Sequence, residues 1–174
     1  MAEQIQSFQD LFLNGLQYVY DAEKQLTEAL PKLVQAAQTP ELKQAFEQHL
    51  QETQEHARRA EQIFSALGQQ PQTKPNNVVQ AMRQEAEKMI QNIQDPQLRD
   101  AALIVAGNQV EHYEMAAYGS LRNFAELMGN QQCVQSLQQT LEEEKKADAK
   151  LTQIGESQVN RQAAQKSQGT AAGR

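Results

Sequence analysis

Hydrophobic residues recur along most of the chain at alternating steps of three and four positions, the spacing that places them on one face of an α-helix. Proline and glycine interrupt this pattern at Thr39-Pro40, Gly68, Asp95-Pro96 and Gly129-Asn130, and such residues end helices or begin new ones. The pattern therefore predicts five helices, over about residues 7–38, 40–67, 78–93, 95–128 and 131–155.

The lengths of these segments favour one arrangement. Two long helical hairpins are joined by a long connection that contains the short helix. Four long helices with one long crossover form the ferritin-like arrangement, whereas a simple up-and-down bundle needs short loops throughout. We predict an all-α, ferritin-like four-helix bundle over residues 1–157, with the short extra helix in its crossover. Residues 158–174 are rich in Gln, Ala, Ser and Gly, and we expect this polar tail to be disordered.

Composition and charge narrow the functional classes. The formal net charge is −6, which argues against binding to nucleic acid or to an anionic membrane surface. The sequence contains no apolar run of roughly 18 residues, so no membrane span is expected. The first residues are polar without a basic segment, and the single Cys133 excludes an internal disulfide. These features favour a soluble cytoplasmic protein without a secretory signal.

Acidic residues occupy positions in the apolar faces of the long helices. In the first helix Glu23 stands between Val19 and Leu26, at a position that should face the core. A buried carboxylate is costly unless it is paired or binds a metal ion. The other long helices bring further polar residues to such positions: His49 and His56 with Glu52 on their flank, Glu111 and Glu114, and Glu144 and Asp148.

These residues are predicted to meet at one level of the bundle. Glu23 lies 16 residues before the turn at Thr39, and position 55 lies 16 residues after it. Glu114 lies 16 residues before the turn at Asn130, and position 146 lies 16 residues after it. Because the helical rise is equal in both arms of a hairpin, each pair of positions should be level.

A layer of this kind favours a dinuclear metal site. Taken alone, a helical glutamate usually faces water, and a histidine on an apolar face is usually a hydrogen-bonded core residue. Several carboxylates in one layer, however, raise one another's pKa, and divalent cations relieve the repulsion. We expect two metal ions, iron in the first place with manganese and zinc as alternatives. His49 and His56 are a heptad apart, so we favour His56 as the nitrogen ligand and keep His49 as the alternative.

Four stretches resemble one known family: YDAEKQL from Tyr20, AFEQHLQET from Ala45, RDAALIVAGNQVEHYEMAAYGSL from Arg99 and TLEEEKKADAKLT from Thr140. In this order and with these gaps, they are similar to the YciE/YciF-type ferritin-like proteins over about residues 6–160. The resemblance implies a ferritin-like fold, a dimer, a dinuclear metal centre and a link to bacterial stress responses.

A more distant likeness is to rubrerythrin. Glu23 and the pair Glu111 and Glu114 match its pattern of acidic ligands. The two Glu-x-x-His motifs of rubrerythrin are altered, because Glu52 is followed by Glu55 at the histidine position and Glu144 is followed by Asp148. Nitrogen ligation should therefore be reduced or rearranged.

Two functions of different classes follow. The first is a stress-related dinuclear metal protein, and any enzymatic activity would be oxidoreductase chemistry with oxygen or peroxide. The alternative is a non-catalytic bundle that acts through protein partners, with its buried carboxylates protonated or paired with histidines. A third possibility, iron storage, would require a closed shell of many subunits. A homodimer is expected, because two-fold pairs are the commonest oligomers. Tyr118 is expected to be a core tyrosine with a satisfied hydroxyl, or else a residue that hydrogen-bonds a ligand or quenches a radical.

Overall fold

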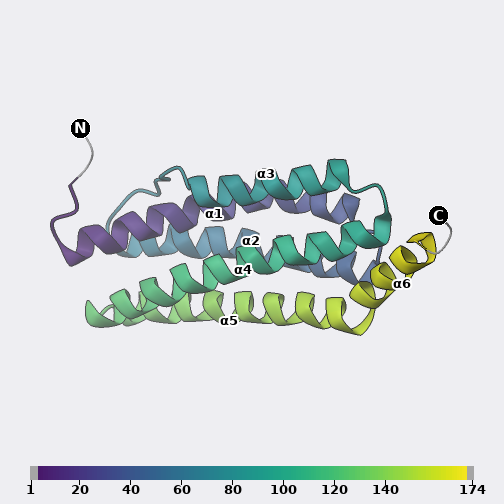
Figure 1. Ribbon diagram of the computed structural model, residues 1–174. Coiled ribbons are helices and arrows are strands. Elements are labelled where there is room, and N and C mark those ends of the chain that lie inside the picture. Colours follow the sequence, from purple (N-terminus) through teal and green to yellow (C-terminus); the bar gives the residue numbers. More distant parts are fainter. Residues whose placement is uncertain (1–3, 172–174) are drawn as a thin grey trace.

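The computed structural model describes residues 4–171, with side chains through residue 166, and contains helices but no strand in that range (Figure 1). The elements in order are α1 (Phe8–Ala36), α2 (Pro40–Ala66), α3 (Asn77–Asn92), α4 (Pro96–Leu127), α5 (Gln131–Ile154), the π-helical turn η1 (Gly155–Val159) and α6 (Asn160–Ala171). The all-α prediction is confirmed, and the first five helices begin and end close to the predicted breaks.

Local chemistry explains where the helices begin and end. At the start of α1, the Ser7 hydroxyl accepts a hydrogen bond from the Asp10 amide at 3.0 Å, and the Asp10 carboxylate accepts one from the Ser7 amide at 2.9 Å. After α2 and α4 the chain turns at glycines with left-handed backbone, Gly68 with φ of 68° and Gly129 with φ of 71°.

The four long helices pair as a ferritin-like bundle. Helices α1 and α2 form one antiparallel hairpin, α4 and α5 form the other, and α2 also packs on α5 and α1 on α4. In Figure 1, α2 and α4 run in the same direction, so the chain between them crosses the length of the bundle. This crossover contains α3, which packs against α1 and α4. The predicted fold class is confirmed.

The apolar core consists of two clusters at opposite ends of the bundle. One includes Phe12, Leu16, Phe64, Leu121 and Leu137, and the other includes Leu26, Leu42, Phe46, Leu103 and Leu151. Each of these buried side chains contributes roughly 1.5–3 kcal/mol to folding. On each long helix, the buried acidic and histidine residues predicted as ligands lie between a member of one cluster and a member of the other. These residues are Glu23, His49, His56, Glu111, Glu114 and Glu144. The acidic layer therefore divides the core.

One buried acid lies outside this layer and stabilises the bundle end. Asp100 on α4 is fully buried, and its two carboxylate oxygens accept hydrogen bonds from the backbone amides of Gln38 at 2.8 Å and Thr39 at 2.7 Å. It ties the start of α4 to the turn between α1 and α2, so both of its oxygens are satisfied by the fold itself.

The C-terminal segment differs from the expected disordered tail. Helix α6 follows α5 after the π-helical turn and packs on α4. Val159 and Ala163 lie four residues apart on one side of this segment and are buried, which gives the otherwise polar sequence an apolar face to dock. The domain boundary at residue 157 stays a prediction. None of the helices between residues 4 and 171 combines the length and apolar character that crossing a lipid bilayer requires.

Candidate metal centre

Six of the eight predicted ligands converge between the two apolar clusters. Helix α1 supplies Glu23, α2 supplies both histidines, α4 supplies two glutamates and α5 supplies one. All six are buried, and Glu23 and Glu144 have no solvent exposure. The level expected from the hairpin geometry is the level at which the side chains meet.

Their ligand atoms form two groups that share one residue. The first group is His49, Glu111, Glu114 and Glu144, and the second is Glu23, His56 and Glu144. Within each group the candidate ligand atoms lie within 4.8 Å of one another. Glu144 has an oxygen available for each group, which is the arrangement of a carboxylate that bridges two ions.

His56 is oriented by a carboxylate on its far side. Its Nε2 atom lies 2.9 Å from Glu143 Oε2, and Arg59 holds the same carboxylate through both of its terminal nitrogens, one of them 3.0 Å from Glu143 Oε1. In the neutral ring this partner favours the proton on Nε2 and leaves the Nδ1 lone pair for the centre. Nδ1 lies 2.9 Å from Glu144 Oε1 and 3.6 Å from Glu23 Oε1.

His49 has a looser arrangement of the same kind. Its Nε2 atom lies 3.1 Å from Glu111 Oε1 and 3.9 Å from Glu144 Oε2. On the other side of the ring, Nδ1 lies 3.7 Å from Glu52 Oε2, beyond hydrogen-bond distance. The side chain of Glu52 is 29% exposed, so this carboxylate is partly hydrated.

Burial and mutual repulsion keep protons in the layer. Burial raises the pKa of Glu23, Glu114 and Glu144, and the neighbouring carboxylates Glu23 and Glu144 raise that of Glu114 further. Burial opposes the charged imidazole of His56, yet its contacts with Glu144 and Glu23 outweigh this effect and raise the His56 pKa to about 10. In the same way, Glu111 and Glu52 raise the pKa of His49 well above its ordinary value against the effect of burial.

Many oxygens in the layer have no hydrogen-bond partner. Both oxygens of Glu114, both of Glu144 and one each of Glu23 and Glu111 are buried without one. An orphaned buried polar atom costs about 1–3 kcal/mol, and the fully satisfied Asp100 shows that this fold can provide partners. His56 Nδ1 and Glu144 Oε1 are close together without forming a hydrogen bond, as two ligands directed at one ion would be. The residues present therefore fit a pair of bound cations.

Two predicted ligands lie outside both groups. Glu52 is on the flank of α2 and lies on the Nδ1 side of the His49 ring, whereas Glu111 lies on the Nε2 side. Asp148, one turn after Glu144, has its Oδ1 atom 3.3 Å from Nε2 of the exposed His112. Both side chains are partly exposed, at 29% and 21%. The preference for a single histidine also differs from the geometry, because His49 and His56 each join a different group, with ring centroids 6.4 Å apart.

Glu143 and Arg59 were not among the predicted site residues. Glu143 belongs to a charged run that reads as a solvated face, and its partner Arg59 is 84 residues away in the chain. The one local signal was the position of Arg59, three residues after His56 and thus on the same side of α2.

Tyr118 is a buried hydrogen-bond donor to the centre. Its hydroxyl donates to Glu23 Oε1, and its ring lies 6.4 Å from that of His56. Burial first, and then the charges of Glu23 and Glu114, raise the pKa of Tyr118 well above its ordinary value. The hydroxyl therefore stays protonated and donates a hydrogen bond to one oxygen of Glu23, whereas the other oxygen of this carboxylate is buried without a hydrogen-bond partner.

The amino-acid sequence of this chain is similar to those of known proteins. A family model described as a domain of unknown function, DUF892, matches residues 7–164. The chain belongs to the DUF892 family. Protein YciF of Escherichia coli (strain K12) is 39% identical over 163 residues, which cover 93% of this chain and 98% of YciF. The relationship therefore includes the whole bundle.

Solved structures of relatives have the same fold. The crystal structure of the E. coli stress protein YciF matches with a TM-score of 0.86 at 38% identity and covers 90% of this chain and 99% of that one. YcfI from Rhodopseudomonas palustris, described as a candidate structural protein, matches with a TM-score of 0.85 at 39% identity and covers 87% and 97%. A protein from Xanthomonas campestris pv. campestris, at 20% identity and a TM-score of 0.73, shares the fold.

Proposed function

We propose that this protein binds two metal ions between its four long helices, iron in the first place with manganese and zinc as alternatives, and that it acts in a stress response by reacting with oxygen or peroxide. The carrying observation is the set of buried carboxylate oxygens without hydrogen-bond partners around the shared Glu144. Oxygen and imidazole donors in this mixture suit iron, manganese and zinc.

In this proposal each side chain has a distinct task. Glu144 would be a ligand to both ions, Glu23 and His56 would complete one site, and His49, Glu111 and Glu114 would complete the other. Bound iron or manganese would supply one-electron redox chemistry toward a small oxidant. The chain itself would provide the buried surroundings, the orientation of His56 through Glu143, and a hydrogen-bond donor at Tyr118 Oη beside Glu23.

The relatives support the biological part of the proposal. YciF is described as a stress protein, and this chain shares 39% of its residues over nearly the full length of both. The cytoplasm as its compartment and a homodimer as its assembly remain proposals, and light scattering of the purified chain tests the second.

A second candidate is a non-catalytic bundle that acts through protein partners. The description of YcfI as a candidate structural protein favours it, and so do the contacts of both histidines with carboxylates, which would neutralise part of the buried charge without a metal. Under this alternative the buried layer holds protons in place of cations.

Metal content separates the two candidates. The purified protein, and the chelated protein after reconstitution with Fe²⁺, Mn²⁺ or Zn²⁺ under anaerobic conditions, is measured by elemental analysis. We expect about two ions per chain, and the variant Glu144→Gln should lose most of both, because it removes the shared ligand charge.

Glu142→Gln is the matched control. Glu142 lies two residues away on α5, its side chain is 48% exposed, and its carboxylate accepts hydrogen bonds from Lys145 and Gln138. Its substitution should leave metal content unchanged. If the wild-type chain takes up none of the three ions, or if both variants lose metal equally, the proposed function fails and the partner-binding bundle is favoured.

A further inference from the structure

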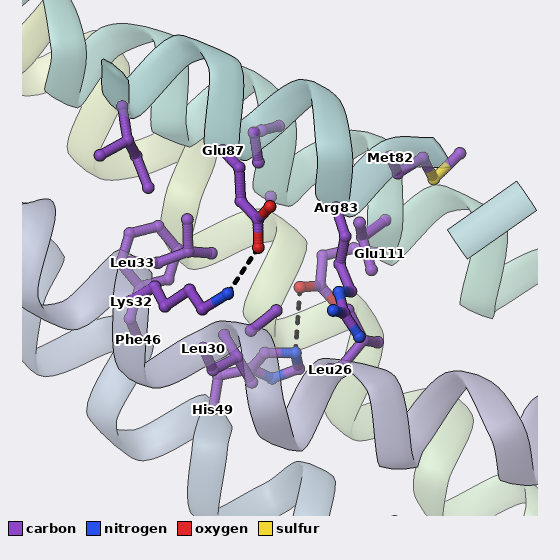
Figure 2. Close-up of a pocket in the computed structure, with 16 residues that line it drawn as sticks. Leu26, Leu30, Lys32, Leu33, Phe46, His49, Met82, Arg83, Glu87 and Glu111 are labelled. Atoms are coloured by element: carbon purple, nitrogen blue, oxygen red, sulfur yellow. Dashed lines mark hydrogen bonds and ion pairs between the residues drawn. The ribbon is translucent and has the colours of Figure 1, made fainter. Parts of the chain in front are cut away.

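Two pockets meet the centre at His49 and Glu111, and the second has the more polar lining. The first lies beneath α3, among α1, α2 and α4, and has a volume of about 40 Å³. Its walls are apolar, with Leu26, Leu30, Phe46, Met82, Ile90 and Val110, and its inner end is formed by His49 and Glu111 (Figure 2). The second, of about 280 Å³, lies between α2 and α5 and has a polar rim.

Ion pairs at the rim hold α3 over the first pocket. Lys32 on α1 and Glu87 on α3 are joined at 2.6 Å, as Figure 2 shows, and Arg83 lies 3.4 Å from Glu28. The Lys32 and Glu87 side chains stay at the surface, 55% and 36% exposed, whereas the Arg83 side chain is 23% exposed. The interior behind them keeps its apolar lining.

Size and lining define what this pocket can hold. One water molecule needs about 10–15 Å³ of such space together with several polar partners, and apolar cavities stay dry and take up apolar atoms such as xenon. The pocket therefore has room for a molecule of two or three heavy atoms, and its walls favour an apolar one. Neither an extended chain nor a mineral core fits.

The second pocket has charged residues at its rim and is suited to polar molecules. It shares Phe46, His49 and Glu111 with the first, but its rim carries Glu52, Lys146 and Lys150. Charged side chains favour hydrated ions and peroxide over an apolar gas. The two pockets thus give the same pair of candidate ligands separate approaches for polar and apolar molecules.

We propose that the apolar pocket beneath α3 is a binding site for dioxygen, held beside His49 and Glu111. This proposal rests on the proposed function, because it names the oxidant and its place at the same centre. It assigns α3, the extra helix of the crossover, a role as the roof of that site.

The direct test is a crystal of the metal-free protein under xenon pressure, since xenon occupies cavities that accept dioxygen. We expect xenon density beneath α3 in the wild-type protein and none there in Ala86→Leu, which fills the pocket from the roof. Ala81→Leu is the control, because Ala81 lies on the same helix but is exposed and does not line the pocket. A wild-type crystal without xenon in this pocket overturns the proposal.

A kinetic test uses protein loaded anaerobically with Fe²⁺. With dissolved dioxygen, ferric absorbance should develop about tenfold more slowly in Ala86→Leu, and also in Ala106→Leu, which fills the pocket from α4. With hydrogen peroxide, both variants should react at the wild-type rate, and Ala81→Leu should match wild type with either oxidant. Equal rates with dioxygen in wild type and in both filled variants contradict the proposal.

The outcomes distinguish this proposal from the function on which it rests. A chain that takes up xenon but no metal contradicts the dinuclear function and leaves a gas-binding cavity. A chain that binds two ions but admits no xenon contradicts the dioxygen site alone.

Discussion

The acidic layer has two halves, which share Glu144 but are enclosed differently. The His56 half consists of Glu23 and His56, and the His49 half consists of His49, Glu111 and Glu114. In the His56 half, Glu143 holds the imidazole and is itself held by Arg59, while Tyr118 holds Glu23. In the His49 half, the carboxylate behind the imidazole is the partly exposed Glu52, at 3.7 Å, and both the apolar and the polar pocket are lined by His49 and Glu111. Neither of those two pockets is lined by Glu23 or His56.

This difference predicts that the two halves bind their metal ions with different affinities. A ligand whose orientation is fixed by a second layer of hydrogen bonds binds a metal ion more tightly than one that is free to move. The His56 half is therefore expected to retain its ion, and the His49 half to exchange ions and meet the oxidant. The following experiments test this asymmetry.

The largest effect is expected from removing the histidines one at a time. His56→Ala should abolish the tightly held ion, whereas His49→Ala should retain about one ion per chain after dialysis, because the enclosed half stays intact. Elemental analysis of both variants gives the answer. If the two variants retain the same amount of metal, the halves are equivalent.

Chelation of the wild-type protein should be biphasic. One ion per chain should leave quickly through the polar pocket, and the second slowly. Complete removal of both ions should lower stability by about 5–8 kcal/mol if each ion is present at 100 to 1,000 times its dissociation constant, and so lower the melting temperature by roughly 20 °C. Metal release is followed with a chromogenic chelator and unfolding by circular dichroism. A single release phase would argue against the asymmetry, and an unchanged melting curve would argue against metal-linked stability.

The carboxylates behind the two histidines should differ in importance. Glu143→Gln should weaken the tighter site about 10–100-fold, the range found for such outer ligands, whereas Glu52→Gln should have a smaller effect because its contact with His49 is longer and partly hydrated. Competition with a chelator of known affinity measures both. A greater loss in Glu52→Gln would reverse the assignment of the enclosed half.

The smallest effect concerns protons in the metal-free protein. The raised pKa values of Glu23, Glu114 and Glu144 destabilise the folded chain as pH rises above their ordinary range. The raised pKa of His56, about 10, gives stability that is complete below its unfolded value of 6.5 and is lost as pH rises toward 10. Both effects have the same sign.

The metal-free protein should therefore melt a few degrees lower at pH 8 than at pH 6. The lowered pKa values of Glu52 and Glu143 do not reverse this trend, since their contribution is already complete above their ordinary range near pH 4.5. Because metal ions displace these protons, the stabilisation by metal should grow over the same interval. Thermal unfolding with and without metal at the two pH values measures it, and a melting temperature that rises with pH in the metal-free form would contradict the assigned protonation.

Much of the centre could be predicted from the sequence, and its omissions have physical causes. Glu23 and His56 were expected at the same level of the bundle because helical rise alone sets their heights. In the structure, Oε1 of Glu23 lies 3.6 Å from Nδ1 of His56. Glu52 and Asp148 were expected in the centre but lie outside both groups, because height along a helix does not determine which way a side chain at the edge of a face turns. The pairing of Glu143 with Arg59 depends on two helices that are distant in the chain.

By itself, the sequence determined the first five helices, the breaks between them, the long crossover and the level at which the acidic residues meet. These follow from local preferences of proline, glycine and capping residues, and from a periodicity that each helix carries alone. Only the tertiary structure decided that Glu144 serves two groups, that one half of the layer is enclosed and the other is reached by two pockets, and that Val159 and Ala163 dock the C-terminal segment. Those properties arise where side chains of different helices meet, and the packing of the helices determines them.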